Sequence, residues 1–282
     1  MQQRKKMRRI IVIPTSGLGN RMRAIAAGYA LATEFHKPLD VVWHKEAGLN
    51  ADFCDIFETE HLPFKVKTVA SLKYLFLYDI PRKKNGFFPA FLRLFDSRKW
   101  LYHDRKTAER MEDEDFRRLA DENRDLVIIS CYPFYTFEEG ILRQLFKPGK
   151  IVEERIAEIT QGENPEIALH IRRTDNNLSI ANSPLCLFES VLVNEISRDK
   201  EVKIFVATDD ESTKSYMAQT YGKNIMYNPA AARRDTIQGM VDAVAELEII
   251  SKCRRIYGSY TSSYSEVASQ LRGGEFIVLC KK

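Results

Sequence analysis

RIIVIPTSGLGNRMRAIAAGYALATEFHKPLDVVW, residues 9–43, is the clearest structural pattern in the sequence. Residues 9–14 and 39–43 are short apolar runs of the kind that form buried strands. Between them, a loop that carries two glycines at 15–20 leads into residues 20–36, where apolar residues recur at the helical period of 3.6. A strand, a helix and a second strand in this order predict a βαβ unit with parallel strands.

The rest of the chain continues this alternation of short strands and helices, which is typical of parallel α/β architecture. Two segments, 72–80 and 87–95, are exceptions, because they are apolar and aromatic without clear turns, and both helix and extended lid stay open there. The turn at 162–165 precedes a second, more regular half. We therefore predict an α/β protein with two Rossmann-like domains, residues 1–162 and 163–282.

The composition is that of a globular protein with a mild excess of positive charge. The 282 residues are 44% hydrophobic and carry a formal net charge of +4, which suits an anionic ligand without requiring nucleic acid. The apolar run at 10–13 is shorter than the roughly 7 residues that a signal peptide needs, and no stretch approaches the roughly 18 apolar residues of a membrane span. The five cysteines are scattered without metal-ligand spacing. We therefore expect no integral membrane segment, reduced thiols and a cytoplasmic location.

Polar residues gather at the ends of three predicted strands in the second half. Ligands of open α/β sheets bind outside the carboxyl ends of the strands. The residues concerned are His170, Arg172, Arg173, Thr174 and Asp175 after the first strand, Thr208, Asp209 and Asp210 after the second, and Ser259 to Ser263 after the third. A guanidinium offers a rigid fork of donors that matches phosphate oxygens, and a helix that begins at Ser262 and Ser263 offers N–H groups to an anion. The pattern predicts a phosphorylated ligand; a surface Arg–Asp network with Ser262 as a simple N-cap is the alternative.

The adjacent carboxylates of Asp209 and Asp210 are also compatible with Mg²⁺ bound to a diphosphate. They follow a strand of the second domain, however, where two arginines are already present to neutralise phosphate. We therefore expect no metal and no other cofactor.

Several motifs resemble those of a known family. HIRRTD at 170–175 resembles the HxRRTD motif of α-1,6-fucosyltransferases, including the nodulation enzymes that decorate chitooligosaccharides. In the order found in that family, VATDD at 206–210, AELEIIS at 245–251 and TSSYS at 261–265 resemble its strand-end ATDD, its carboxylate-bearing helix and its TSS segment. GLGNRM at 17–22 is similar to the GxGN loop of the wider fucosyltransferase-like superfamily, which includes protein O-fucosyltransferases.

The resemblance covers roughly residues 10–43 and 166–279. It implies a GT-B architecture of two facing Rossmann-like domains, with the acceptor on the side of residues 1–162 and the donor nucleotide bound by residues 163–282. The reaction that it implies is an inverting, metal-independent transfer of fucose from GDP-fucose to a glycan acceptor.

The same resemblance implies roles for individual residues. Arg172 would contact the donor diphosphate, and His170 and Glu246 would lie near guanine, whose adjacent N1–H and N2 donors suit a forked carboxylate. Asp242, one turn before Glu246, is the competing carboxylate. The other nucleotide-pocket candidates are Asp209, Asp210, Ser262, Ser263 and Tyr264, and the N-terminal loop contributes Gly17, Gly19, Asn20 and Arg21 to donor or acceptor binding. The candidate catalytic residues are Arg172, Arg173 and Asp175.

One departure from the family concerns the catalytic base. The family's loop continues after HxRRTD into a lysine and then a catalytic glutamate, whereas NNLSI follows here and contains no acid. Inverting transfer needs a group that takes the proton of the acceptor hydroxyl. The candidates are Asp175, Glu46 and His44.

Two other functions stay open at this point. A catalytically silent protein that binds a sugar nucleotide or a glycan is compatible with the missing glutamate. A nucleic-acid-binding module is suggested by the basic N-terminus and the basic, aromatic stretch at 73–99, but no recognised nucleic-acid-binding motif is present. We therefore expect a sugar nucleotide and a glycan acceptor as partners, and no nucleic acid.

Overall fold

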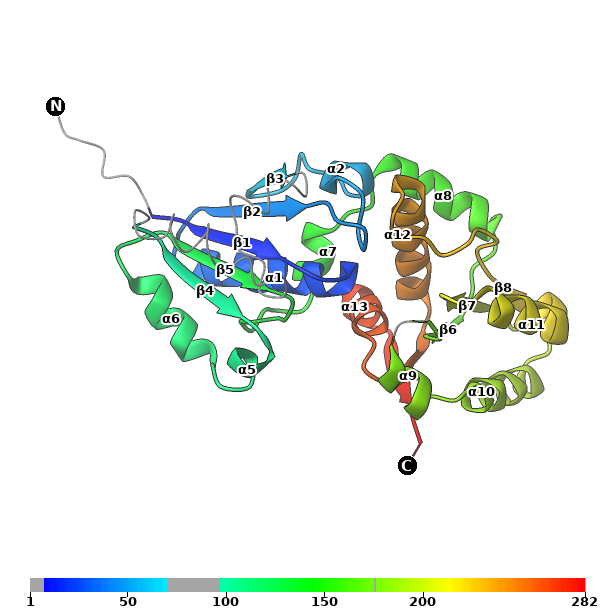
Figure 1. The fold of residues 1–282 in the computed structure, drawn as a ribbon. Coiled ribbons are helices and arrows are strands. Elements are labelled where there is room, and N and C mark those ends of the chain that lie inside the picture. The colour runs from blue at the N-terminus through cyan, green and yellow to red at the C-terminus, as the bar shows by residue number, and fades with distance from the viewer. Residues whose placement is uncertain (1–7, 70–96, 175, 282) are drawn as a thin grey trace. The chain divides into compact units, whose positions relative to one another are not determined.

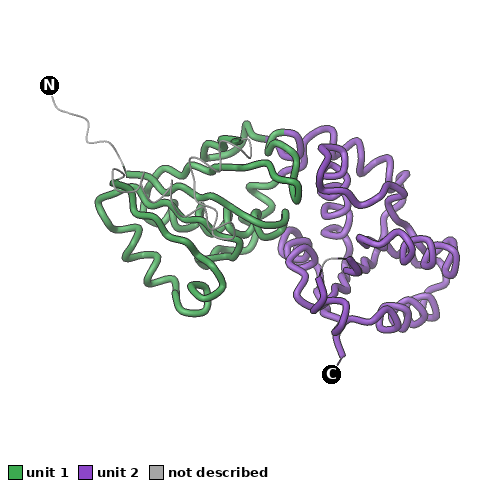
Figure 2. The backbone as a smooth tube through the Cα atoms, in the orientation of Figure 1, with its two compact units in different colours: residues 1–54, 59–146 green, residues 55–58, 147–282 purple. Residues whose placement is uncertain are grey.

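The structure, a computed structural model, describes residues 8–69, 97–174 and 176–281. The segments 72–80 and 87–95, most of the stretch 73–99 and the candidate base Asp175 therefore lie outside the described residues. The chain forms two compact units, each with its own sheet (Figures 1 and 2). Unit 1 is Met1–Cys54 with Thr59–Phe146, and unit 2 is Asp55–Glu58 with Lys147–Lys282.

Unit 1 is built on a five-stranded parallel sheet. Its elements are β1 (Ile10–Pro14), α1 (Leu18–Glu34), β2 (Leu39–His44), β3 (Lys65–Val69), β4 (Lys99–His103), α5 (Arg105–Ala108), α6 (Asp113–Asp121), β5 (Leu126–Ser130) and α7 (Ile141–Leu145), with α2 (Phe53–Ile56) at the unit boundary. The strand order is β3-β2-β1-β5-β4, and β1 pairs in parallel with both β2 and β5. The βαβ unit predicted for residues 9–43 is therefore confirmed as β1-α1-β2.

Unit 2 repeats this architecture. Its elements are α8 (Lys150–Thr160), β6 (Ile167–Ile171), α9 (Asn177–Asn182), α10 (Leu185–Arg198), β7 (Ile204–Thr208), α11 (Glu211–Tyr221), η1 (Gly222–Asn224), β8 (Ile225–Met226), α12 (Ile237–Lys252), β9 (Arg255–Ser259), α13 (Ser263–Arg272) and β10 (Glu275–Leu279). The strands are all parallel in the order β10-β9-β6-β7-β8. The central strand β6 therefore has β7 on one side and β9 on the other.

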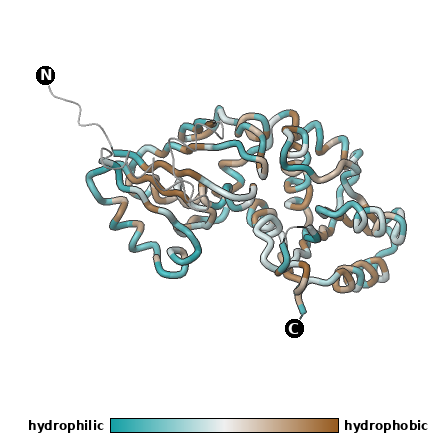
Figure 3. Tube along the Cα trace, viewed as in Figure 1, coloured by the Kyte–Doolittle hydropathy of each residue, from teal (hydrophilic) through white to brown (hydrophobic). Residues whose placement is uncertain are grey.

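Strands β6 and β7 of unit 2 are buried over their whole length, and the hydropathy colouring shows the same apolar character in the strands of unit 1 (Figure 3). On one face of β6, Leu169 and Ile171 pack into a buried cluster with Phe188 and Leu192 of α10. Alternate residues of a strand point to opposite faces, so His170 points to the other face, where α13 lies. In the part of the chain that the structure describes, no helix combines the length and the apolar character needed to cross a membrane.

The boundary between the units differs from the one expected at residue 162. Helix α8 was assigned to the first half by its place in the sequence, but it packs against α12 of unit 2. Unit 2 therefore begins at Lys147 and takes in a short excursion of the chain at 55–58. Backbone hydrogen bonds join the two pieces, from Gly149 N–H to the Ile56 carbonyl and from Glu58 N–H to the Lys147 carbonyl.

Candidate functional site

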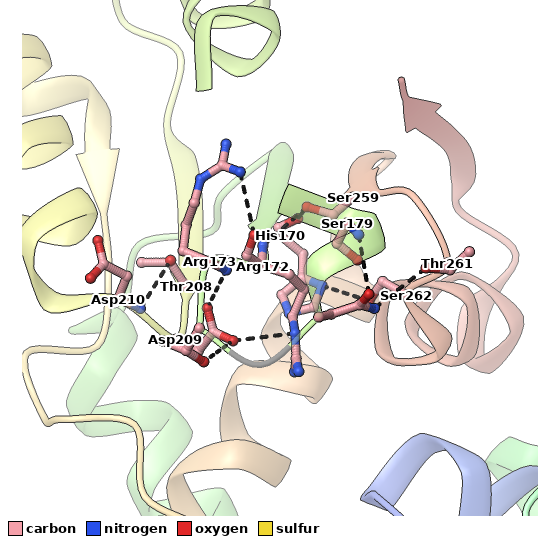
Figure 4. A network of polar contacts seen from close by, with 12 residues as sticks. His170, Arg172, Arg173, Ser179, Thr208, Asp209, Asp210, Ser259, Thr261 and Ser262 are labelled. Atoms are coloured by element: carbon pink, nitrogen blue, oxygen red, sulfur yellow. Dashed lines mark hydrogen bonds and ion pairs between the residues drawn. The ribbon is translucent and has the colours of Figure 1, made fainter. Parts of the chain in front are cut away.

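The candidate site lies where β6, β7 and β9 end. Because β6 pairs in parallel with both neighbours, the three carboxyl ends meet at one edge of the sheet. The structure thus brings His170, Arg172, Asp209 and Ser262 together, as the polar contacts in Figure 4 show. The sequence-based expectation that these strand ends share one edge is confirmed.

The Asp209 carboxylate holds the loop that follows β6. Its Oδ1 accepts a hydrogen bond from Arg173 N–H at 2.7 Å, and its Oδ2 accepts one from the Thr174 hydroxyl at 2.8 Å. Arg172 Nε lies 3.2 Å from the same Oδ2. One carboxylate therefore fixes both the backbone of this loop and the first guanidinium.

His170 is buried and bonded to serine hydroxyls of the segment that follows β9. Its Nδ1 lies 2.7 Å from Ser265 Oγ and 3.1 Å from Ser262 Oγ, and its ring lies against that of Tyr264 at a centroid distance of 4.8 Å. Burial, followed by the nearby charge of Arg172, lowers the pKa of His170 to about 3. His170 is therefore neutral at physiological pH and acts as a hydrogen-bonding group.

Two residues of the β9–α13 segment allow this arrangement. Gly258 pairs with His170 across the sheet, and a Cβ at that position would lie 2.6 Å from Ser265 Oγ, so only glycine leaves room for the serine. Ser262 occupies the N-cap position of α13, but its hydroxyl reaches His170 and makes no capping hydrogen bond. Ser262 is thus not a simple N-cap, and it leaves the first-turn N–H groups of α13, which begins at Ser263, uncapped by its side chain.

The two adjacent arginines extend in opposite directions from the end of β6 (Figure 4). Arg172 lies on the His170 side, where burial lowers its pKa and the Asp209 charge raises it. The Arg173 guanidinium lies over the ring of Phe188, 6.0 Å from its centroid, on the α10 side. The structure therefore places only Arg172 with the other site residues, and Arg173 faces the opposite side of the sheet.

Asp210 caps a helix. Its Oδ2 accepts hydrogen bonds from Thr213 N–H at 2.8 Å, from the Thr213 hydroxyl at 2.6 Å and from the Ser212 hydroxyl at 2.6 Å. It is the N-cap of α11, for which aspartate is among the preferred residues. The Asp209 and Asp210 carboxylates are thus hydrogen-bonded to the β6 loop and to the first turn of α11. Among the described residues, no group of three or more His, Cys, Asp or Glu could hold a metal ion.

Helix α12 contributes Glu246 to the same region. The hydroxyl of Tyr264 donates to the carbonyl of Ala243, which joins this turn of α12 to the ring that packs on His170. Burial raises the pKa of Glu246 to about 7, against the lowering effects of Asn228 and Lys214. The competing carboxylate, Asp242, is engaged by Arg155, whose Nε donates to Asp242 Oδ1 at 2.6 Å. Asp242 is thus held by an ion pair, whereas the Glu246 carboxyl group is supported more weakly by the Asn228 amide, and the role of Glu246 in binding stays a prediction.

Three residues of this region were not found from the sequence: Arg155, Asn228 and Arg234. Arg155 bonds to both Asp242 and Asn228 from α8, which the sequence assigned to the other domain. The positive charge of Arg234 lies close enough to His170 and Arg172 to lower the pKa of both. Its position a few residues beyond β8, at the same edge of the sheet, was the signal that could have identified it.

The N-terminal motif forms a buried network within unit 1. The Arg21 side chain is wholly buried, and it donates to the Ser16 carbonyl at 2.8 Å, to the His44 carbonyl at 2.6 Å and to Glu46 Oε1 at 2.8 Å. Asn20 donates to the Ser16 hydroxyl at 3.2 Å. Arg21 therefore ties the loop before α1 to the end of β2. Gly17 is the N-cap of α1, and Gly19 is buried in its first turn.

Two of the three candidate bases lie beside this network. The hydrogen bond with His44, helped by the charge of Arg21 and opposed by burial, lowers the pKa of Glu46 to about 2. A carboxylate with so low a pKa is a weak proton acceptor at neutral pH. The third candidate, Asp175, lies outside the described residues.

Two parallel five-stranded sheets flanked by helices give the chain an α/β fold like that of the GT-B fucosyltransferases. The NodZ alpha-1,6-fucosyltransferase soaked with GDP-fucose matches with a TM-score of 0.60 at 16% identity, over 94% of this chain and 92% of that one; NodZ is from Bradyrhizobium. A mutant of Arabidopsis thaliana FUT1 in complex with GDP matches with a TM-score of 0.62 at 13% identity, over 97% and 70% of the two chains. POFUT1 in complex with GDP matches with a TM-score of 0.54 at 11% identity, over 97% and 99%.

At these identities the likeness shows the fold. The sequence itself matches no protein-family model and no curated protein. The fold class expected from the motifs is nevertheless confirmed, because the fold is that of these fucosyltransferase structures.

The contacts of the two strand-end aspartates predict opposite outcomes for one conservative change. Asp209→Asn places an amide N–H₂ against the Thr174 hydroxyl and Arg172 Nε, and we expect the free energy of unfolding to fall by about 1–3 kcal/mol. Asp210→Asn is the matched control, because asparagine caps helices as well as aspartate, and we expect a change below about 0.5 kcal/mol. Urea denaturation measures both values. Equal losses in the two variants would contradict the bridging role of Asp209.

Proposed function

We propose that the protein is a glycosyltransferase that transfers fucose, with inversion, from GDP-fucose to a glycan acceptor. The observation that carries the proposal is Arg172, a largely buried guanidinium held by Asp209 at the carboxyl edge of a parallel sheet, beside neutral His170. Structures of the same fold contain GDP or GDP-fucose, which supports this nucleotide as the donor.

In the proposed reaction, the bond between C1 of the sugar and the oxygen of the β-phosphate breaks while the acceptor oxygen bonds to C1. Negative charge then grows on the departing GDP, and the acceptor hydroxyl loses its proton to a base. Arg172 and the first N–H groups of α13 stabilise that charge, because oriented donors in a site shielded from water act most strongly where charge develops. The base is one of Asp175, His44 and Glu46, of which Glu46 is the least suited because its pKa is about 2.

We propose that no metal takes part, because a guanidinium can neutralise the diphosphate. Asp209 and Asp210 support this assignment, since their carboxylates are bonded to the β6 loop and to the first turn of α11. The protein would act in the cytoplasm, on the basis of its composition.

One observation favours a second candidate, a catalytically silent protein that binds GDP-fucose or a glycan. The segment that carries the glutamate in α-1,6-fucosyltransferases is here the short helix α9, whose N-cap Asn176 accepts a hydrogen bond from Ser179 N–H. Binding of GDP-fucose without hydrolysis or transfer would support this candidate. A thermal-shift panel of GDP, GDP-fucose, GDP-mannose, UDP and ADP tests nucleotide binding for both, because a ligand stabilises the native state to which it binds.

The first prediction from the proposed function concerns Arg172. Arg172→Ala should weaken GDP binding by about 1.5–3 kcal/mol, the range for a charge-assisted contact, without loss of folding. Arg173→Ala is the matched control, because that guanidinium faces α10, and we expect a clearly smaller loss of affinity. Calorimetry with GDP measures both. Unchanged affinity in a folded Arg172→Ala variant would remove this residue from the binding site.

The second prediction concerns the protonation of Glu246, whose pKa burial raises to about 7. Only the carboxylate can accept from both N1–H and N2 of guanine, so affinity should rise with pH and be about tenfold higher near pH 8 than near pH 6. Guanosine is the better probe, because it has no phosphate that titrates in this range. His170, with a pKa of about 3, does not contribute to the change.

Glu246→Gln provides the test of this assignment. The amide does not titrate, so the variant should bind guanosine weakly with no dependence on pH, and its preference for GDP over UDP should fall. A pH dependence that survives in Glu246→Gln would show that another group causes it.

The third prediction concerns metal. If Arg172 stabilises the leaving diphosphate, release of GDP from GDP-fucose, by transfer to an acceptor such as a chitooligosaccharide or by slow hydrolysis, should persist in excess EDTA. Complete loss of turnover with EDTA and recovery with Mg²⁺ or Mn²⁺ would overturn this assignment and make Asp209 and Asp210 candidate ligands.

A further inference from the structure

A buried asparagine, Asn228, lies in the loop that follows β8, and its amide oxygen is hydrogen-bonded within the protein. Its side-chain oxygen Oδ1 accepts a hydrogen bond from Arg155 Nη2 at 2.8 Å and another from Ala230 N–H at 3.0 Å. The residue is only 2% exposed. Because a guanidinium and a backbone N–H can only donate, the atom that faces them must be the oxygen, and this fixes which way the amide points.

The amide nitrogen of Asn228 must therefore face the other way. It is buried and has no partner at hydrogen-bond geometry among the described residues. A buried N–H₂ group without a partner destabilises the folded state. An amide nitrogen carries two N–H groups, so one that is directed only weakly at a neighbouring carboxylate still has a donor to offer a ligand.

The contacts of Arg155 place this nitrogen beside Glu246. The guanidinium that holds Asn228 also holds Asp242, one turn before Glu246 on α12. The amide nitrogen of Asn228 is directed at the Glu246 carboxyl group and favours its charged form by a weak hydrogen bond that falls short of full geometry. The intervening residue Ala243 accepts the hydrogen bond of the Tyr264 hydroxyl. Asn228 thus lies beside the turn of α12 that carries Glu246, next to the aromatic ring that packs on His170.

We propose that Asn228 is a specificity-determining residue that donates a hydrogen bond to a ring carbonyl of the nucleotide base, while Glu246 accepts from the neighbouring ring N–H groups. Arg155 is a positioning residue that holds the amide in the donating orientation. This inference rests on the proposed function, since it assigns the base of the same nucleotide.

The donor and acceptor pair selects one kind of base edge. Guanine presents the O6 carbonyl next to N1–H and the N2 amino group, and all three match. Hypoxanthine lacks only the N2 amino group, so it keeps the contact with Asn228 and loses one with Glu246. Adenine presents an amino group and a bare ring nitrogen, which oppose both residues. A mismatched base leaves buried polar groups without partners, and this produces large discrimination.

Asn228→Asp tests the inference with almost no change of shape. The introduced carboxylate still accepts from Arg155 and Ala230 N–H, but it replaces the donor by an acceptor. Calorimetry of the full chain with GDP, IDP and ADP should show GDP and IDP weakened about 10- to 100-fold, and ADP changed less than about threefold. Asn194→Asp, the same change on the exposed surface of α10, is the control and should leave all three affinities unchanged.

Arg155→Lys provides a second variant without a new negative charge. Lysine can still pair with Asp242, but it cannot hold both Asp242 and the Asn228 oxygen in one fixed plane. Release of the amide should therefore lower the ratio of GDP to ADP affinity about 3- to 10-fold, with native circular dichroism. This variant decides the question if Asn228→Asp does not fold.

The outcomes separate this inference from the proposed function. A GDP preference in the unaltered protein that falls in both variants supports the role of Asn228. Equal weakening of all three nucleotides, or no change in folded variants, overturns that role and leaves the proposed function standing. An unaltered protein that binds GDP no better than ADP overturns the donor assignment and this inference with it.

Discussion

The Asp209 carboxylate is the contact on which the strand-edge site of unit 2 depends. The chain leaves the regular structure of β6 at two consecutive arginines, whose side chains extend in opposite directions. Asp209 accepts hydrogen bonds from Arg173 N–H and the Thr174 hydroxyl and forms an ion pair with Arg172, so it sets both the path of the chain and the direction of one guanidinium. The cation is therefore oriented by folding and does not have to be ordered when an anion binds.

The second constraint is burial, which keeps the imidazole next to this cation neutral. An imidazolium at position 170 would add a charge beside Arg172 in a site with little water, and the low pKa of His170 reflects that cost. The neutral ring instead bonds to Ser262 and Ser265 and packs on Tyr264. Since the Tyr264 hydroxyl is bonded to α12, the region near Arg172 and the region near Glu246 are parts of one connected structure.

The sequence could predict the location of the site but only part of its geometry. The HIRRTD and VATDD motifs follow parallel strands, so their meeting at one edge was predictable from the alternation of strands and helices. The direction of Arg173 was predictable too, because strand alternation places it with Ile171 on the face of the hydrophobic cluster. The role of Arg155 was not, because its contacts with Asp242 and Asn228 exist only once α8 packs against α12.

Some polar groups of unit 2 have strong hydrogen-bond or ion-pair partners within the protein, and others are left for a ligand. Asp210 and Asp242 look like binding residues in the sequence, but a helix N-terminus and Arg155 use them. Glu246 has only weak support from the Asn228 amide and the charge of Lys214, and burial outweighs both and raises its pKa. Groups of the second kind cost stability in the folded protein without a ligand, and a ligand that satisfies them recovers that cost on binding. Residue type alone cannot distinguish the two kinds, because the distinction lies in which groups the fold places beside each carboxylate and each amide.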